Sequence, residues 1–90
     1  MPSYKGDIKM EHTRAHIRLM TNQDAVEFVS ILNSDGTAIK YSLENFDGTR
    51  RVEARSLLGV LYFTTEHNDD TYLVNDTNGE IPTTIDKFRV

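Results

Sequence analysis

Alternating apolar and polar positions predict four β-strands along this chain. Residues 16–21 alternate in this way, and residues 38–46 (AIKYSLENF) do so without interruption, which is typical of strands with one buried face. An Asp-Gly pair follows at once and is a strong hairpin signal, so residues 49–54 are expected to return as a third strand. Residues 71–75 (TYLVN), set between two polar turns, predict the fourth.

Helical spacing predicts one helix between the first two strands and another near the C-terminal end. In residues 24–36 the apolar side chains recur every three or four positions. Asp24 with Glu27 has the spacing of a capping box, which predicts the start of this helix, and Gly36 supplies a stop. Apolar residues at helical spacing in residues 81–88, with a proline tolerable in a first turn, predict a short terminal helix.

The segment between the hairpin and the last strand has a pattern that local rules leave open. Residues 53–63 read EARSLLGVLYF, and a helical stripe follows a serine of the type that caps helices. The stripe comprises Leu57, Leu58, Leu61 and Tyr62. The β-formers toward its end favour a strand instead, and periodicity alone does not decide. In a helix these side chains form either core alone or core together with a surface for a partner.

Composition is that of one small globular domain. The 90 residues are 38 % hydrophobic and 27 % charged, and they include no cysteine, which excludes disulfides, zinc–thiolate sites and thiol nucleophiles. A polar N-terminal segment and the lack of a long apolar run lead us to expect a cytoplasmic protein without membrane contact or cofactor. Residues 1–21 carry a net charge of +2 and residues 22–90 one of −6, so nucleic-acid binding is not expected.

Given this order of elements, the segment RSLLGVLYF resembles the second helix of HPr, the small phosphocarrier protein of the bacterial sugar phosphotransferase system. In that family a serine caps a short helix that reads roughly Ser-Ile-Met-Gly-Val-Met, and Ser56, Gly59 and Val60 are identical to it. The resemblance covers about residues 16–90. It implies an α+β, HPr-like open-faced β-sandwich of about four antiparallel strands with helices packed on one face, preceded by an extension at residues 1–15.

The family's carrier histidine is missing from its expected place. In the family it lies in a Gly-(Ile/Leu)-His-Ala-Arg-Pro-Ala block, where a helix N-terminus stabilises the phosphoryl group. Here that junction reads MTNQDAVEF, which contains Gln23. In the regulatory relative Crh, a glutamine likewise takes the place of the histidine. The resemblance therefore implies a non-enzymatic regulatory or protein-interaction module that has lost phosphocarrier activity. Two alternatives stay open: a phosphocarrier that uses an unconventional histidine, and a structural or assembly protein on the same fold.

The resemblance also assigns two roles to the segment at residues 56–63. A dedicated kinase phosphorylates the serine of HPr and Crh that matches Ser56, and Arg55 stands next to it to pair with a phosphate. Without the resemblance, Ser56 is simply a helix cap. The same helix docks enzymes and regulators in the family, which implies a surface for protein partners here. That surface would comprise Arg55, Leu57, Leu58, Leu61 and Tyr62, together with Gln23.

The histidines predict no metal site and no catalytic residue. His12 and His16 are four residues apart, but a strand is predicted at His16 and no third ligand is placed beside them. His67, in the polar stretch EHNDD, is expected to be solvated. No Ser-His-Asp set, carboxylate pair or glycine-rich phosphate loop can be assembled from the sequence, so we predict no enzyme.

Overall fold

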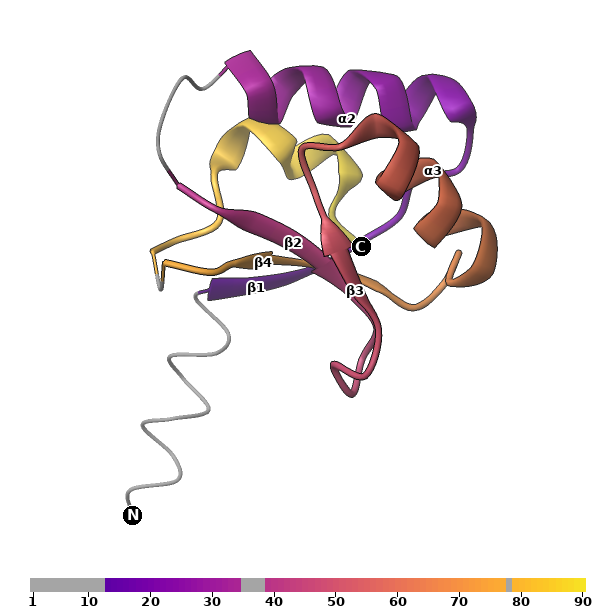
Figure 1. The fold of residues 1–90 in the computed structure, drawn as a ribbon. Helices are drawn as coiled ribbons and strands as arrows, with labels where there is room; N and C mark the ends of the chain where they lie inside the picture. Colours follow the sequence, from indigo (N-terminus) through magenta and orange to yellow (C-terminus); the bar gives the residue numbers. More distant parts are fainter. Residues whose placement is uncertain (1–12, 35–38, 78) are drawn as a thin grey trace.

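A computed structural model describes residues 13–34, 39–77 and 79–90, in which strands and helices follow one another in the predicted order (Figure 1). The elements are β1 (Arg14–Ile17), α2 (Asn22–Ser34), β2 (Tyr41–Glu44), β3 (Arg51–Glu53), α3 (Leu57–Glu66), β4 (Thr71–Asn75) and the 3-10 helix η1 (Thr83–Phe88). Most of the predicted N-terminal extension, residues 1–12, lies outside the described residues, and so does Gly36, the predicted helix stop.

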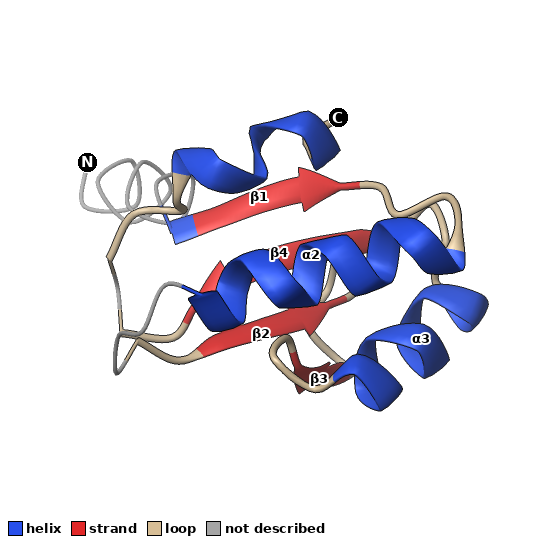
Figure 2. Ribbon diagram, turned by 90° about the horizontal axis from the view of Figure 1, so that it is seen from above, coloured by secondary structure: helices blue, strands red, loops and turns tan. Residues whose placement is uncertain are grey.

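The four strands form one antiparallel sheet in the order β1-β4-β2-β3. Figures 1 and 2 show α2, α3 and η1 together over one face of this sheet. None of the described helices covers the other face, which we call the open face. The predicted α+β class with four antiparallel strands is therefore confirmed. β1 begins at Arg14, two residues before the strand that the alternation predicts.

The core lies between the sheet and the helices. Each strand turns alternate side chains toward the helices, as in β1, where Ala15 and Ile17 are buried. The largest fully buried apolar side chains are Ile17, Phe28, Leu32, Leu43, Val60, Leu73 and Ile85. Phe28 of α2 meets Phe88 of η1 edge to face, with ring centroids 5.8 Å apart. Helices and strands that are distant in the sequence thus share one core.

The start of α2 differs from the prediction in which residue caps it. The helix begins at Asn22, and the hydroxyl of Thr21 accepts the N–H of Asp24 (3.0 Å). The carboxylate of Asp24 reaches back to the N–H of Met20 (3.0 Å), so Asp24 is the acidic member of the capping arrangement. Glu27, the predicted acidic member, pairs instead with Lys87. The sequence rule found the helix but placed its cap three residues late.

The hairpin between β2 and β3 turns at the predicted Asp-Gly pair. Gly48 has φ 74°, a left-handed conformation that glycine adopts at little cost, and its N–H donates to the carbonyl of Asn45 (3.0 Å). Asp47 Oδ1 accepts two hydrogen bonds from Thr49, from the hydroxyl (2.8 Å) and from the backbone N–H (3.2 Å). These bonds favour the charged carboxylate and hold the pKa of Asp47 below its ordinary value of 3.8.

Replacing Thr49 with valine is expected to raise the pKa of Asp47 toward 3.8, because the hydroxyl bond is the largest cause of its depression. Since the folded pKa is lowered, the contribution of Asp47 to stability is present above 3.8 and is lost as the pH falls through the folded pKa. An NMR titration of the Asp47 carboxyl carbon measures this directly. Thr65→Val, on the exposed side of α3, is the matched control and should leave the titration unchanged. An unaltered Asp47 pKa in Thr49→Val would contradict this cause.

The predicted terminal helix forms, but as the 3-10 segment η1, with a kink at Ile85 (φ −102°, ψ 15°). Ile85 and Phe88 are buried as their spacing predicts. The last residues then run antiparallel to the outer edge of β1. Arg18 N–H donates to the carbonyl of Phe88 (2.8 Å), and Val90 N–H donates to the carbonyl of His16 (3.0 Å). The C-terminal end therefore covers the β1 edge of the sheet.

Candidate functional site

The segment EARSLLGVLYF forms helix α3, and Ser56 is its N-cap. The Ser56 hydroxyl accepts the N–H of Gly59 (3.3 Å), and its carbonyl accepts the N–H of Val60 (2.9 Å). Ser56 itself has an extended backbone (φ −95°, ψ 111°), which is usual for a cap. This hydrogen bonding excludes the strand that the β-formers near the end of the segment favoured.

α3 buries one side and exposes the other. Val60 and Phe63 lie in the core, and Leu61 packs against it from a partly buried position. Three large apolar side chains remain exposed, and we call them the outer face of α3: Leu57 (38 % exposed), Leu58 (79 %) and Tyr62 (65 %). Leu58 and Tyr62 are four residues apart, so they neighbour one another on the helix surface. The interpretation of this segment as core alone is therefore wrong.

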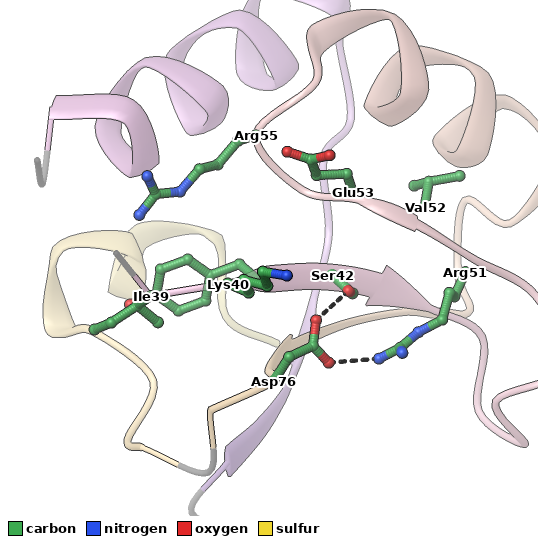
Figure 3. A pocket seen from close by; sticks show the side chains of 9 residues that line it. Ile39, Lys40, Ser42, Arg51, Val52, Glu53, Arg55 and Asp76 are labelled. Carbon is green, nitrogen blue, oxygen red and sulfur yellow. Dashed lines mark hydrogen bonds and ion pairs between the residues drawn. The ribbon is translucent and has the colours of Figure 1, made fainter. Parts of the chain in front are cut away.

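Arg55 and Gln23, the other two residues of the predicted surface, lie outside α3 itself: Arg55 precedes the helix, and Gln23 belongs to α2. Arg55 extends away from α3 (Figure 3), and its guanidinium carbon lies 5.6 Å from the centroid of the Tyr41 ring. Gln23 is exposed in the first turn of α2. The last turn of α2 lies at the start of α3, because Asn33 donates to the carbonyl of Arg55 (3.4 Å). Ten residues separate Gln23 from Asn33, about 15 Å along the helix axis, so Gln23 and Ser56 lie at opposite ends of α2.

The described histidines lie away from helix N-termini. His16, in β1, stacks on Tyr72 with ring centroids 4.6 Å apart and an interplanar angle of 17°. His67 is the C-cap of α3, and its ring lies 4.6 Å from that of Phe63. Helix amides and the helix dipole stabilise a phosphoryl group only at an N-terminus. Neither histidine is therefore placed as a phosphocarrier of the usual kind, and His12 lies outside the described residues.

The open face of the sheet carries a connected set of charged and aromatic side chains that the sequence analysis did not single out. Arg14 is at its centre and is only 17 % exposed. Its guanidinium donates to the carbonyls of Asn45 (2.9 Å) and Phe46. The same group lies 4.3 Å from the centroid of the Tyr72 ring and 3.8 Å from Glu44. This arrangement ties β1 to the β2–β3 hairpin across β4.

Arg51 of β3 extends this set across the sheet. It lies 3.2 Å from Glu44 and 2.6 Å from Asp76, and Asp76 also accepts a hydrogen bond from the hydroxyl of Ser42. Strand alternation is the signal that could have found these residues, because each occupies a position whose side chain faces away from the helices. The acids and bases are paired with one another, which is typical of a structural network rather than a catalytic set.

A cleft of about 500 Å³ opens next to this network, between the start of β2 and the end of β3 (Figure 3). Its basic residues are Lys40, Arg51 and Arg55, and its acidic residues are Glu53 and Asp76. Asp76 is already engaged by Arg51. Within the described ranges, no group of three histidine, aspartate or glutamate side chains could hold a metal ion.

Comparisons with known proteins found no match: no family model, curated protein or solved structure matches the chain. Among the described residues, no helix is both long and apolar enough to cross a membrane. The outer face of α3 brings three of the exposed large apolar side chains of the described residues together on one helix.

Proposed function

We propose that this chain is a non-catalytic, HPr-like protein that binds a protein partner through the outer face of α3. The observation that carries this proposal is the exposure of Leu58 and Tyr62 side by side on a helix whose opposite side is in the core. The order of elements, the antiparallel sheet with one open face and the serine cap of α3 also support it. All three are what the resemblance to HPr leads one to expect.

Burying the exposed leucine and tyrosine side chains of α3 against a partner would contribute substantially to the free energy of association. Burying a large apolar side chain contributes about 1.5–3 kcal/mol, and tyrosine is among the residues enriched at the centres of protein interfaces. Leu57, partly exposed beside Leu58, widens the apolar surface. A partner with a complementary apolar groove fits this helix, since helices that dock in grooves use anchors at such spacings.

Two features support a role without catalysis. The charged side chains of the open face pair among themselves, as with Arg51 and Asp76 at 2.6 Å, so they are not held ready for a substrate. His16 is stacked on Tyr72, and His67 lies against Phe63 at the end of α3. These positions favour binding over phosphoryl transfer.

Replacing Leu58 with glutamate is expected to weaken partner binding about thirtyfold or more, because a charge then occupies an apolar contact at the centre of the interface. The partner is first captured with the wild-type chain and purified, and its affinity for each variant is then measured by calorimetry.

Val90→Glu is the matched control, because Val90 is 66 % exposed and lies at the C-terminal end, which Figure 2 shows on the far side of α2 from α3. It should bind as the wild type does. Equal affinity of all three proteins, or equal weakening by both variants, would contradict docking through α3.

A further inference from the structure

The two edges of the sheet differ in how they are protected. The C-terminal residues cover β1, with Val90 N–H bonded to His16, whereas no described segment pairs with the outer side of β3. β3 is short, and both Arg51 and Glu53 are exposed. Short length and charge usually protect an edge strand from unwanted pairing. Here, however, the two charges are opposite and stand on either side of one apolar residue, Val52.

The hydrogen bonds around β3 define which backbone groups face outward. Ala54 N–H donates to Tyr41 (3.0 Å), and Arg50 accepts from Asn45 N–H (3.2 Å), so the even-numbered residues 50, 52 and 54 face β2. In an antiparallel pair the residues between them direct their N–H and C=O groups the other way. The backbone groups of Arg51 and Glu53 therefore point out of the sheet. The carbonyl of Glu53 receives a long bond from Ser56 N–H (3.3 Å) and retains a second lone pair.

We propose that β3 pairs with β3 of a second copy of this chain, antiparallel and centred on Val52, which joins the two sheets into one. In this register Arg51 of each copy stands opposite Glu53 of the other, and the two Val52 residues face one another. The outward backbone groups of Arg51 and Glu53 then exchange hydrogen bonds, because they form the hydrogen-bonded pairs of the new ladder. Both ion pairs lie on the open face, where Arg51 already contacts Asp76.

Charge selects this register over its neighbours. Pairing is restricted to registers that match outward-facing residues with one another, so the alternatives are displaced by two residues. One of these places Arg51 opposite Arg51, and the other places Glu53 opposite Glu53, and like charges directly opposite one another are destabilising. The Val52-centred register alone gives two attractive pairs. The strand is thus complementary to itself, which favours a second copy over an unrelated extended segment.

Sedimentation velocity over a range of concentrations tests this proposal with two charge reversals. The wild-type chain should show a monomer–dimer equilibrium, and Arg51→Glu or Glu53→Arg should each raise the dissociation constant about tenfold or more. A 1:1 mixture of the two variants should restore dimers, because every facing pair is then again of opposite charge. Glu80→Arg, at an exposed residue outside the sheet, is the control and should dimerise as the wild type does.

Several outcomes would overturn the proposal. The proposal is wrong if the wild-type chain is monomeric at all concentrations, or if the Glu53→Arg variant dimerises like the wild type. It is also wrong if the chain is a monomer that binds an extended peptide of another protein along β3. Arg51→Glu also loses its contacts with Glu44 and Asp76, so circular dichroism must show that this variant is folded. Glu53→Arg loses no described ion pair, so it gives an independent test. The Leu58→Glu variant should still form dimers, because Leu58 lies on α3 and not on β3. It therefore distinguishes dimerisation through β3 from docking through α3.

Discussion

Replacing Phe28 with alanine is expected to lower the free energy of unfolding by about 3–5 kcal/mol. Phe28 is 0 % exposed, and its ring meets Phe88 edge to face at 5.8 Å, so the variant loses both burial and an aromatic contact. Small domains have a total stability of about 5–15 kcal/mol, so much of the margin would be removed. Urea denaturation followed by circular dichroism measures the change.

Val26→Ala provides the matched control for this measurement. Val26 lies on the same helix, two residues earlier, but is 43 % exposed, so its truncation should cost less than about 1 kcal/mol. Similar losses in Phe28→Ala and Val26→Ala would show that α2 does not pack on the sheet through the Phe28 side.

Replacing Asn75 with leucine is expected to cost about 2–3 kcal/mol, because it removes the partners of a buried polar turn. Asn75 is 2 % exposed, and its Oδ1 accepts the N–H (2.9 Å) and the hydroxyl (2.6 Å) of Thr77. Its Nδ2 donates to the carbonyl of Glu80 (3.1 Å). A leucine has the same branched shape but can form none of these bonds. Thermal and urea denaturation measure the loss.

The control for this variant is Asn33→Leu. Asn33 is exposed and makes one long bond, to the carbonyl of Arg55 at 3.4 Å, so its replacement should change stability by less than about 0.5 kcal/mol. An Asn75→Leu variant as stable as Asn33→Leu would show that the bonds of the Asn75 turn contribute little to the fold.

Most elements could be predicted because they depend on residues close together in the sequence, as the hairpin depends on the Asp-Gly pair, with Gly48 at φ 74°. Local rules left α3 open between helix and strand, and the resemblance to HPr favoured the helix capped by Ser56. The strand order β1-β4-β2-β3 could not be predicted from local patterns, since it pairs segments such as Ala15 and Leu73 that are far apart in the sequence. Chain periodicity carries no information about which strand is next to which.

The same limit explains why the network on the open face was missed. Arg14 reaches Asn45, 31 residues away, only because β4 brings β1 and β2 to either side of it. Sequence alternation shows that Arg14 and Glu44 face away from the core, but their meeting follows from the register of three strands.

The sequence predicted the apolar residues of α3 but not which side of the helix is exposed. The predicted stripe included Leu58 and Tyr62, which are exposed, but it also included Leu61, which packs against the core. The residues that hold α3 to the sheet are Val60 and Phe63. A helix that is apolar nearly all round gives no signal of which side packs inward, because that depends on its orientation over the sheet.

An NMR titration of the isotope-labelled chain with the purified partner tests docking through α3 most directly. The proposal predicts that the largest shifts fall on the amides of residues 57–62 and on the methyl groups of Leu58. Arg14 and Tyr72, on the open face, should be unaffected. Shifts confined to the open face or to β3, with the signals of Leu58 and Tyr62 unchanged, would contradict the proposal.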